Sequence, residues 1–268
     1  MKKHLFTQEE INEIIYDYTV LKKGRKVIAK KFHIGDKTLL RVLKENNISV
    51  KTIQETNTSK YNINHNYFSN QGHNQAYIMG FLAADGNVSR VDNRIDLELF
   101  SQDHEILEKI RIELELEREV KIYTCSNGYE KHKLYFYSAQ IKKDLEKYGI
   151  VPNKTYSKDF HFPYLLNNEY IIDYIRGMFD GDGSVKECNH TIGFQIDNAN
   201  KEILSEIQHW FKKEHNIEVK IRETSKANIP LYRLYCYGEN SRKIYNILYT
   251  PNSLFLQRKF DKWRELLK

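Results

Sequence analysis

The first fifty residues place apolar side chains three and four positions apart, the spacing of helices that bury one face. The pattern predicts three short helices, over residues 7–18, 24–32 and 36–46. Thr7 and Glu10 have the spacing of a capping box, which fixes the start of the first helix. We expect an all-α domain over residues 1–50, with Val27 and Ile28 of the second helix facing inward.

Residues 51–75 are rich in Asn, Ser and Thr and lack a sustained apolar period. They are predicted to form a linker with short extended pieces. The string Asn64-His65-Asn66 shares letters with an HNH nuclease motif, but a second His and helically spaced metal ligands are missing. We therefore expect no nuclease site in this segment.

The rest of the chain is organised around an internal repeat at an offset of 97 residues. Residues 77–88 and 174–185 share the identities Tyr77/Tyr174, Ile78/Ile175, Gly80/Gly177, Asp85/Asp182, Gly86/Gly183 and Val88/Val185. Each copy precedes two alternating strands, a helix, two more strands and a helix. This order predicts an α+β fold of two tandem αββαββα units, over residues 76–155 and 170–268, related by a pseudo-twofold axis.

Both repeated segments place small residues four positions apart, as Gly80 and Ala84 or as Gly177 and Gly181. Residues at this spacing share one helix face, where small side chains let two helix backbones approach closely. Each interior glycine costs a helix about 1 kcal/mol, so close helix packing is the expected compensation. The two segments are therefore predicted to pack against each other.

An aspartate followed by a glycine ends each predicted helix, at Asp85-Gly86 and at Asp182-Gly183. The glycines are expected at the C′ position, so the carboxylates lie at the negative end of each helix dipole. If the helices pack in parallel, the two carboxylates meet at one point and repel each other. A divalent metal ion would relieve that repulsion and use it for catalysis.

The two segments resemble the paired motifs of LAGLIDADG homing endonucleases of the two-motif, monomeric type. The matching stretches are Ile78-Met79-Gly80-Phe81-Leu82-Ala83-Ala84-Asp85-Gly86 and Ile175-Arg176-Gly177-Met178-Phe179-Asp180-Gly181-Asp182-Gly183, within residues 72–268. The resemblance implies a site-specific endonuclease that hydrolyses phosphodiester bonds in both DNA strands with Mg²⁺ or Mn²⁺. Asp85 and Asp182 would hold the metal, and whether the backbone near Ala84 joins them is left open. Ala83 stands where the second copy has Asp180, which is expected to bond locally.

The resemblance also implies one catalytic lysine from each half beside the metals. The stretches 149–155 and 252–260 resemble the segments that carry these lysines, and they supply Lys154 and Lys259. Both ammonium groups are expected to orient water or to offset charge that develops on the phosphate. Gln102 and Asn198, near the ends of the second strand of each half, are expected to position water molecules.

Strand alternation predicts one face of basic and aromatic side chains on each sheet. The residues expected there are Lys121, Tyr123, Lys220, Arg222, Arg233 and Tyr235. A solvated sheet face would show the same pattern. The resemblance implies instead a concave surface that contacts the major groove of double-stranded DNA over a long asymmetric target site.

The second and third predicted helices resemble the helix-turn-helix of resolvase-like and repressor-like DNA-binding domains. The matching residues are Ile28, Ala29, Phe32, Ile34, Thr38, Leu39 and Leu43. Ala29 is small enough to let the two helices cross closely. The resemblance implies that Lys37, Thr38 and Arg41 face the major groove, and a plain three-helix bundle is the alternative.

Positive charge is concentrated near the N-terminus. Residues 1–70 contain 13 Lys and Arg against 7 Asp and Glu, whereas residues 71–268 contain 29 of each, so the first segment carries the entire net charge of +6. Such a segment is typical of a polyanion-binding module, although a solvated basic surface would give the same count.

Composition and spacing exclude several other classes of protein. No stretch approaches the roughly 20 apolar residues of a membrane span, and the polar start argues against a signal peptide. The three cysteines, Cys125, Cys188 and Cys236, are too far apart for a CxxC metal knuckle. We expect a cytoplasmic monomer that needs neither a membrane nor an obligate protein partner.

Two further functions are considered on the same scaffold. A non-cleaving DNA-binding transcription regulator or an intron RNA maturase would bind nucleic acid without needing Asp85 or Asp182. An intein remnant is disfavoured, because the chain begins Met-Lys-Lys and ends Glu-Leu-Leu-Lys without splicing residues. Retention of both carboxylates favours the endonuclease.

Overall fold

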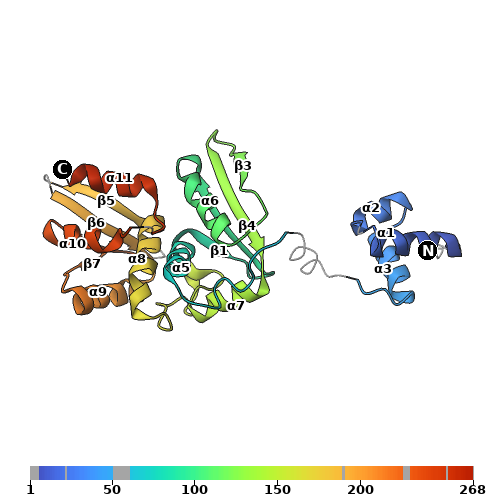
Figure 1. The fold of residues 1–268 in the computed structure, drawn as a ribbon, viewed down its shortest axis with the longest axis horizontal. Coiled ribbons are helices and arrows are strands. Elements are labelled where there is room, and N and C mark those ends of the chain that lie inside the picture. The colour runs from blue at the N-terminus through green and yellow to red at the C-terminus, as the bar shows by residue number, and fades with distance from the viewer. Residues whose placement is uncertain are drawn as a thin grey trace. The chain divides into compact units, whose positions relative to one another are not determined.

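The computed structural model describes residues 6–21, 23–50, 61–188, 191–225, 230–251 and 253–267. The chain divides into two compact units, Met1–Thr56 and Asn57–Lys268, each with its own hydrophobic core (Figure 1). Within the described ranges, every helix is too short or too polar to cross a membrane. Cys125 and Cys236 are free thiols, and the side chain of Cys188 lies outside the described residues.

The N-terminal unit contains three helices, α1 (Gln8–Thr19), α2 (Arg25–Lys31) and α3 (Asp36–Glu45). The predicted capping box is formed, since Thr7 Oγ1 accepts from the Glu10 N–H and Glu10 Oε2 accepts from the Thr7 N–H. Val27 was expected in the core but is 58% exposed. Ile28 faces inward as expected, and Ala29 is buried beside it.

The C-terminal unit consists of two αββαββα repeats and one further helix. The first repeat comprises α5 (His73–Asp85), β1 (Gly86–Val88), β2 (Arg94–Phe100), η1 (Ser101–Asp103), α6 (His104–Glu113), β3 (Lys121–Thr124), β4 (Glu130–Tyr137) and α7 (Ala139–Lys147). The second comprises α8 (Asn168–Asp182), β5 (Gly183–Cys188), β6 (Thr191–Asn198), α9 (Lys201–His215), β7 (Lys220–Ser225), β8 (Leu231–Tyr237) and α10 (Glu239–Leu248). A short 3-10 helix, η2 (Lys154–Tyr156), joins the repeats, and α11 (Gln257–Leu266), which the sequence pattern did not predict, follows the second.

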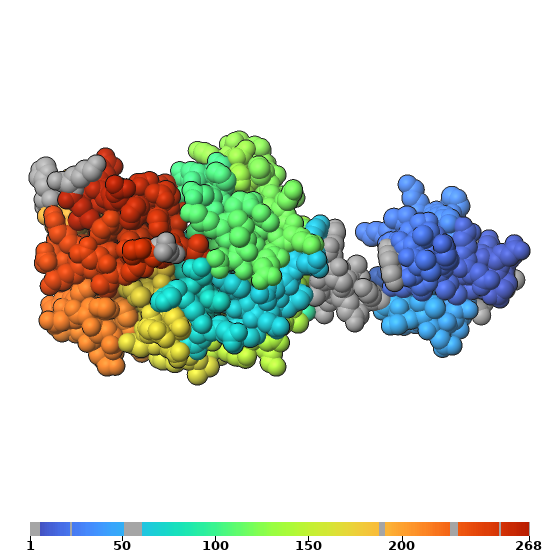
Figure 2. All heavy atoms as spheres, in the orientation of Figure 1, coloured from blue at the N-terminus to red at the C-terminus, as the bar shows by residue number. Residues whose placement is uncertain are grey.

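Each repeat forms one antiparallel four-stranded sheet, in the orders β1-β2-β4-β3 and β5-β6-β8-β7. Helices cover one face of each sheet: α6 packs on β2 and β4, whereas α9, α10 and α11 pack on strands of the second sheet. Figure 2 shows the second repeat, in orange and red, packed directly against the first, in cyan and green. The structure therefore has the predicted tandem α+β architecture.

The predicted linker is too long at its C-terminal end. Residues 61–72 belong to the C-terminal unit, where Tyr67 and Phe68 are buried in the main core and Tyr67 Oη donates to Glu113 at 2.9 Å. This aromatic pair anchors the segment, although the Asn-rich sequence around it resembles a loop. Helix α5 then begins at His73. Residues 51–60 of the predicted linker lie outside the described residues.

Helices α5 and α8 lie side by side at the centre of the C-terminal unit and make the most extensive contact between any two elements described (Figure 1). A Cβ added to Gly80 would lie 2.0 Å from the backbone oxygen of Tyr174, and one added to Gly177 would lie 2.1 Å from that of Tyr77. Only glycine fits so close an approach, and the resulting packing offsets its cost in a helix.

The contacts further along the two helices establish their direction. Gly80 of α5 contacts Tyr174 of α8. Further toward the C-terminal end of both helices, Ala84 of α5 contacts Gly181 of α8. The contacts therefore follow the same order along both helices, so α5 and α8 are parallel. As a consequence, both helices end on the same side of the molecule.

The glycines that follow the two helices have a different role from the one predicted. Gly86 and Gly183 have φ of −75° and −91°, an extended conformation and not the left-handed one of a C′ glycine. A Cβ would lie 2.6 Å from Leu82 O at Gly86 and 2.5 Å from Phe179 O at Gly183. Lack of space, not backbone conformation, requires glycine at these positions.

We predict that Gly177→Ala destabilises the C-terminal unit by about 3 kcal/mol or more, because its methyl group overlaps the α5 backbone and must push the helices apart. Urea unfolding followed by circular dichroism measures the change. Gly24→Ala is the control, since a Cβ there meets nothing within 4 Å and φ is −66°. An equal effect of the two substitutions would contradict the tight helix contact.

Candidate active site

Asp85 and Asp182 are the last residues of α5 and α8, so the parallel packing of these helices brings both carboxylates to one place. Burial and, to a smaller extent, the nearby Asp85 carboxylate together raise the pKa of Asp182 to about 6. Burial also raises the pKa of Asp85. The predicted convergence of two like charges is thus present in the fold.

Lys154 and Lys259 reach the same two helix ends from opposite repeats. Lys154 Nζ donates to Ala84 O and, at 2.9 Å, to Leu82 O. Lys259 Nζ donates to the equivalent oxygens in α8, Phe179 O at 2.7 Å and Gly181 O at 3.2 Å. The two lysines are therefore related by the same pseudo-twofold axis as the carboxylates.

Lys259 has additional acceptors, Asp180 O and Gly183 O, both at 2.6 Å. An ammonium group has three N–H donors, so these carbonyl groups use its full donor capacity. Burial lowers the pKa of both Lys154 and Lys259 to about 8. Their positive charge offsets the negative ends of α5 and α8 and the adjacent carboxylates.

Asp180 was expected to form a hydrogen bond within its own helix end, but its partners lie elsewhere. It is fully enclosed, and its Oδ2 accepts from Tyr77 Oη of α5 at 2.9 Å and from the Leu256 N–H at 2.7 Å. Leu256 is the N-cap of α11, so Asp180 joins both central helices to the element that carries Lys259. Burial raises the pKa of Asp180 to about 6.

The first repeat lacks this arrangement, because Ala83 occupies the position of Asp180. The hydroxyl group of Tyr174, which corresponds to Tyr77, is buried without a hydrogen-bond partner. Ala83 offers the Tyr174 hydroxyl group no acceptor of the kind that Asp180 offers to Tyr77.

An ion pair that the sequence analysis missed joins the two repeats near the carboxylates. Arg258 donates from Nε and Nη2 to the two carboxylate oxygens of Asp103, both at 2.9 Å. The negative charge of Asp103 helps to raise the pKa of Asp85. The positive charge of Arg258 helps to lower the pKa of Lys259. The only sequence signal was the position of Arg258 directly before Lys259.

Asn198 and Gln102 are not equivalent positions. Asn198 Nδ2 donates to Asp182 Oδ2 at 3.1 Å, whereas Gln102 lies in η1 with an exposed side chain. Gly86 pairs with Leu97, and Gly183 pairs with Ile196, so the counterpart of Asn198 is Leu99. Gln102 lies beyond the strand end because η1 adds residues between strand and helix in the first repeat, and the positioning of water by Gln102 and Asn198 stays a prediction.

The donor chemistry at the two helix ends fits a divalent cation. Among the described residues, no three His, Cys, Asp or Glu side chains gather as a metal-binding group. Mg²⁺ in phosphoryl-transfer sites needs only one or two carboxylates, with water and substrate phosphates completing the octahedron. Asp85, which is exposed, and Asp182, which is half-buried, offer that minimal set at one place, and both have raised pKa values.

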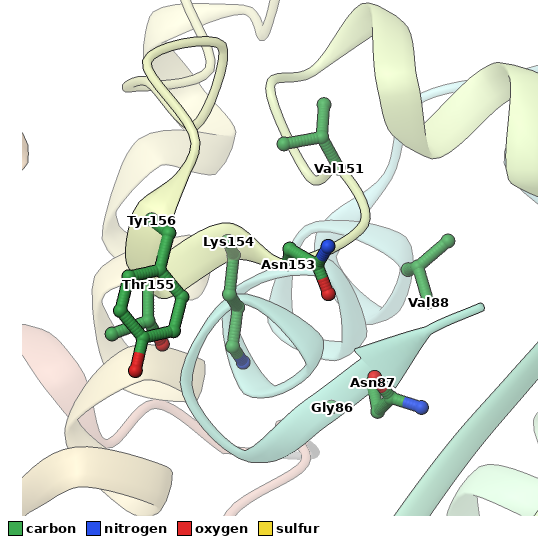
Figure 3. Close-up of a pocket in the computed structure, with 8 residues that line it drawn as sticks. All are labelled: Gly86, Asn87, Val88, Val151, Asn153, Lys154, Thr155 and Tyr156. Carbon is green, nitrogen blue, oxygen red and sulfur yellow. The ribbon is translucent and has the colours of Figure 1, made fainter. Parts of the chain in front are cut away.

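A pocket of about 230 Å³ opens beside the lysine of the first repeat (Figure 3). Its lining residues are Gly86, Asn87, Val88, Val151, Asn153, Lys154, Thr155 and Tyr156. Asn153 has a left-handed conformation with φ of 54°, which Asn tolerates, and it starts the turn of η2. Figure 3 shows Lys154 directed from this turn toward the end of α5.

The predicted DNA-contacting residues lie together on the sheet faces that the helices leave free. Strand register places Lys121 opposite Lys133 and Tyr123 opposite Lys131 in the first sheet. In the second sheet, Lys220 lies opposite Tyr235 and Arg222 opposite Arg233. Acidic residues missed by the sequence analysis hold some of these cations: Glu98 binds Lys131 and Lys133 at 3.0 Å, and Asp197 binds Arg233 at 2.7 Å.

The remaining predicted residues lie in the N-terminal unit. Lys37 is exposed on α3, and Thr38 and Arg41 are half-buried there. Arg41 donates to Glu45 at 3.2 Å, one turn further along the same helix.

Each repeat matches a known domain family. Residues 169–248 match the LAGLIDADG-like domain, and residues 74–139 match the WhiA LAGLIDADG-like domain. Together with the two αββαββα units, these matches define a tandem LAGLIDADG fold.

The chain is also similar to individual proteins of Methanocaldococcus jannaschii. It is 26% identical to the uncharacterized protein MJ0314 over 61% of this chain and 62% of that protein. It is 26% identical to the DNA-directed RNA polymerase subunit Rpo1C over 74% of this chain but only 24% of that subunit. The crystal structure of I-DmoI in complex with DNA and Ca superposes with a TM-score of 0.49 and 14% identity, over 75% of this chain and 99% of I-DmoI.

We predict that Asp182→Asn stabilises the metal-free protein at pH 8. Between about pH 4 and 6 the folded chain binds more protons at Asp182 than the unfolded chain, so stability falls as pH rises through this window. The amide removes this penalty, which corresponds to about 2–3 kcal/mol. Urea unfolding in EDTA should show the gain at pH 8 and its disappearance at pH 4.

The exposed Asp159→Asn is the control for this experiment, with no change expected at either pH. A loss of stability in Asp182→Asn at pH 8 would show that the carboxylate is not under electrostatic strain.

Proposed function

We propose that this protein is a metal-dependent, site-specific double-strand DNA endonuclease of the homing type. The observation that carries the proposal is the meeting of Asp85 and Asp182 at the ends of two parallel helices, with Lys154 and Lys259 at the same place. A protein that only binds DNA has no need to place two like charges at one point.

The proposed mechanism assigns a separate task to each group. Asp85 and Asp182 would hold Mg²⁺ or Mn²⁺, and the ion would supply activation of water and stabilisation of the leaving oxygen of the scissile phosphate. Lys154 and Lys259 keep the helix ends in place through the backbone carbonyls and add positive charge beside the phosphates. Because both lysines donate to carbonyl groups, their role is electrostatic rather than that of a general base.

The sheet faces supply the DNA-binding surface. Basic and aromatic side chains occupy matching positions on both sheets, so a duplex lying across them would present its two strands to the two carboxylates. We propose that Lys121, Tyr123, Lys220 and Arg222 contact the duplex directly. Arg233 is held by Asp197, and this fixed guanidinium suits a specific contact with a base edge.

The N-terminal unit is proposed to add DNA contacts outside the cleavage site. Its second and third helices have the order and the small crossing residue, Ala29, of a helix-turn-helix. Lys37, Thr38 and Arg41 of α3 would then enter the major groove. The protein is proposed to work as a monomer, because one chain already contains both carboxylates.

A DNA-binding regulator without cleavage is the second candidate. The first repeat matches a WhiA-type domain, and it has Ala83 at the position that corresponds to Asp180. Both proposed metal ligands, Asp85 and Asp182, are present, however. The endonuclease is therefore the favoured function, and a DNA cleavage assay distinguishes it from the regulator.

We predict that the wild-type protein linearises a plasmid carrying its target in Mg²⁺, and that Asp182→Asn lowers the rate at least about 10³-fold while binding in Ca²⁺ is kept. The target is recovered beforehand from a randomised duplex library by binding in Ca²⁺. Asp159→Asn should cut like the wild type. Tight binding with no cutting by the wild-type protein would favour the regulator.

We further predict that Lys37→Ala combined with Arg41→Ala flattens the salt dependence of DNA binding. Loss of two phosphate contacts should reduce the slope of log K against log[salt] by up to about 2. Lys243→Ala on α10, which packs on the helix-covered side of the second sheet, is the control. An unchanged slope in the double variant would show that α3 does not contact DNA.

A further inference from the structure

The two repeats surround their carboxylates with different partners. Asp182 Oδ2 accepts a hydrogen bond from Asn198 Nδ2 at 3.1 Å, and Asn198 is itself held because its Oδ1 accepts from the Asn200 N–H at 2.9 Å. At the equivalent position of the first repeat stands Leu99, a buried apolar side chain that cannot donate to Asp85. Within the part of the chain that the structure describes, a fixed amide therefore orients Asp182 and not Asp85.

The charge next to each carboxylate also differs. Asp103 precedes α6 and acts on Asp85 as a second negative charge, although Arg258 pairs with it. The corresponding residue before α9 is the uncharged Asn200, whose side chain caps that helix. The first repeat thus places an additional acid beside its carboxylate, and the second does not.

The two lysines are supported to different degrees. Lys259 is carried by α11 and donates to four backbone carbonyls, and Asp180 ties the start of α11 to both central helices. Lys154 is carried by the short turn η2 beside a pocket and donates to two carbonyls. The half of the site that contains Asp182 is the more rigidly built one.

We infer that the two DNA strands are cut in sequence, that the half-site of Asp182 cuts first, and that Asn198 is the positioning residue responsible for this order. The inference rests on the proposed endonuclease function. A carboxylate held in place before the metal and the phosphate arrive needs less reorganisation to reach the transition state, so its half-site reacts faster.

The test measures the cleavage rate of each strand separately. A duplex target, recovered by Ca²⁺-dependent selection and labelled differently at the 5′ end of each strand, is cut in Mg²⁺ with enzyme in excess. The wild-type protein should cut one strand about 10-fold faster than the other, and a supercoiled plasmid with the same target should pass through a nicked circle.

Asn198→Leu gives the second repeat the side chain that the first repeat has at the equivalent position, Leu99. It should slow the faster strand about 10-fold and leave the slower strand's rate within about twofold. Asn198→Asp, which keeps the acceptor for the Asn200 N–H but has no amide donor, should slow the same strand. Ile207→Val in the core of α9 is the stability control, and it should lower the melting temperature without changing the ratio of the two rates.

The outcomes separate this inference from the function beneath it. Equal strand rates in the wild-type protein, or an equal slowing of both strands by Asn198→Leu in a protein that still binds DNA in Ca²⁺, would overturn sequential cutting and leave the endonuclease intact. Failure of the wild-type protein to cut any selected duplex in Mg²⁺ or Mn²⁺ would overturn the endonuclease and this inference together.

Discussion

Close contact between the backbones of α5 and α8 is the constraint on which the rest of the C-terminal unit depends. Gly80 and Gly177 allow each helix to reach the peptide groups of the other, so the two helices cannot slide or rotate without overlap. Each sheet starts directly where its helix ends, at Gly86 and Gly183. The same contact therefore sets the distance between the sheets, the direction of their free faces and the meeting of Asp85 and Asp182.

That meeting is electrostatically unfavourable in the protein alone. Two carboxylates lie at the negative ends of two helices, Asp85 exposed and Asp182 half-buried, and partial burial together with nearby negative charge raises their pKa values. Lys154 and Lys259 reduce the problem by binding the terminal carbonyls, but burial lowers their own pKa values to about 8. A divalent cation with phosphate oxygens would stabilise such a cluster further, in keeping with the proposed reaction.

The pseudo-twofold symmetry holds for the order of the elements and of the strands in each sheet, but not for the side chains around the carboxylates. The two lysines bind equivalent carbonyls, yet they come from a short turn in one case and from a helix in the other. Asp180 has an elaborate set of partners, whereas its counterpart Ala83 leaves the hydroxyl group of Tyr174 unsatisfied. One chain that contains both halves can vary them independently.

Local pattern in the sequence determined the repeat, most strands and helices, and the pair of carboxylates, because periodicity and small-residue spacing are properties of neighbouring residues. Tertiary structure alone decided which partners those residues meet. The Asp103–Arg258 pair spans 155 positions, and Asn198 reaches Asp182 only through strand register. Tyr67 and Phe68 lie in a polar stretch that only packing against distant helices turns into core. Long-range contacts of this kind leave no period in the chain, so they become visible only when the fold is complete.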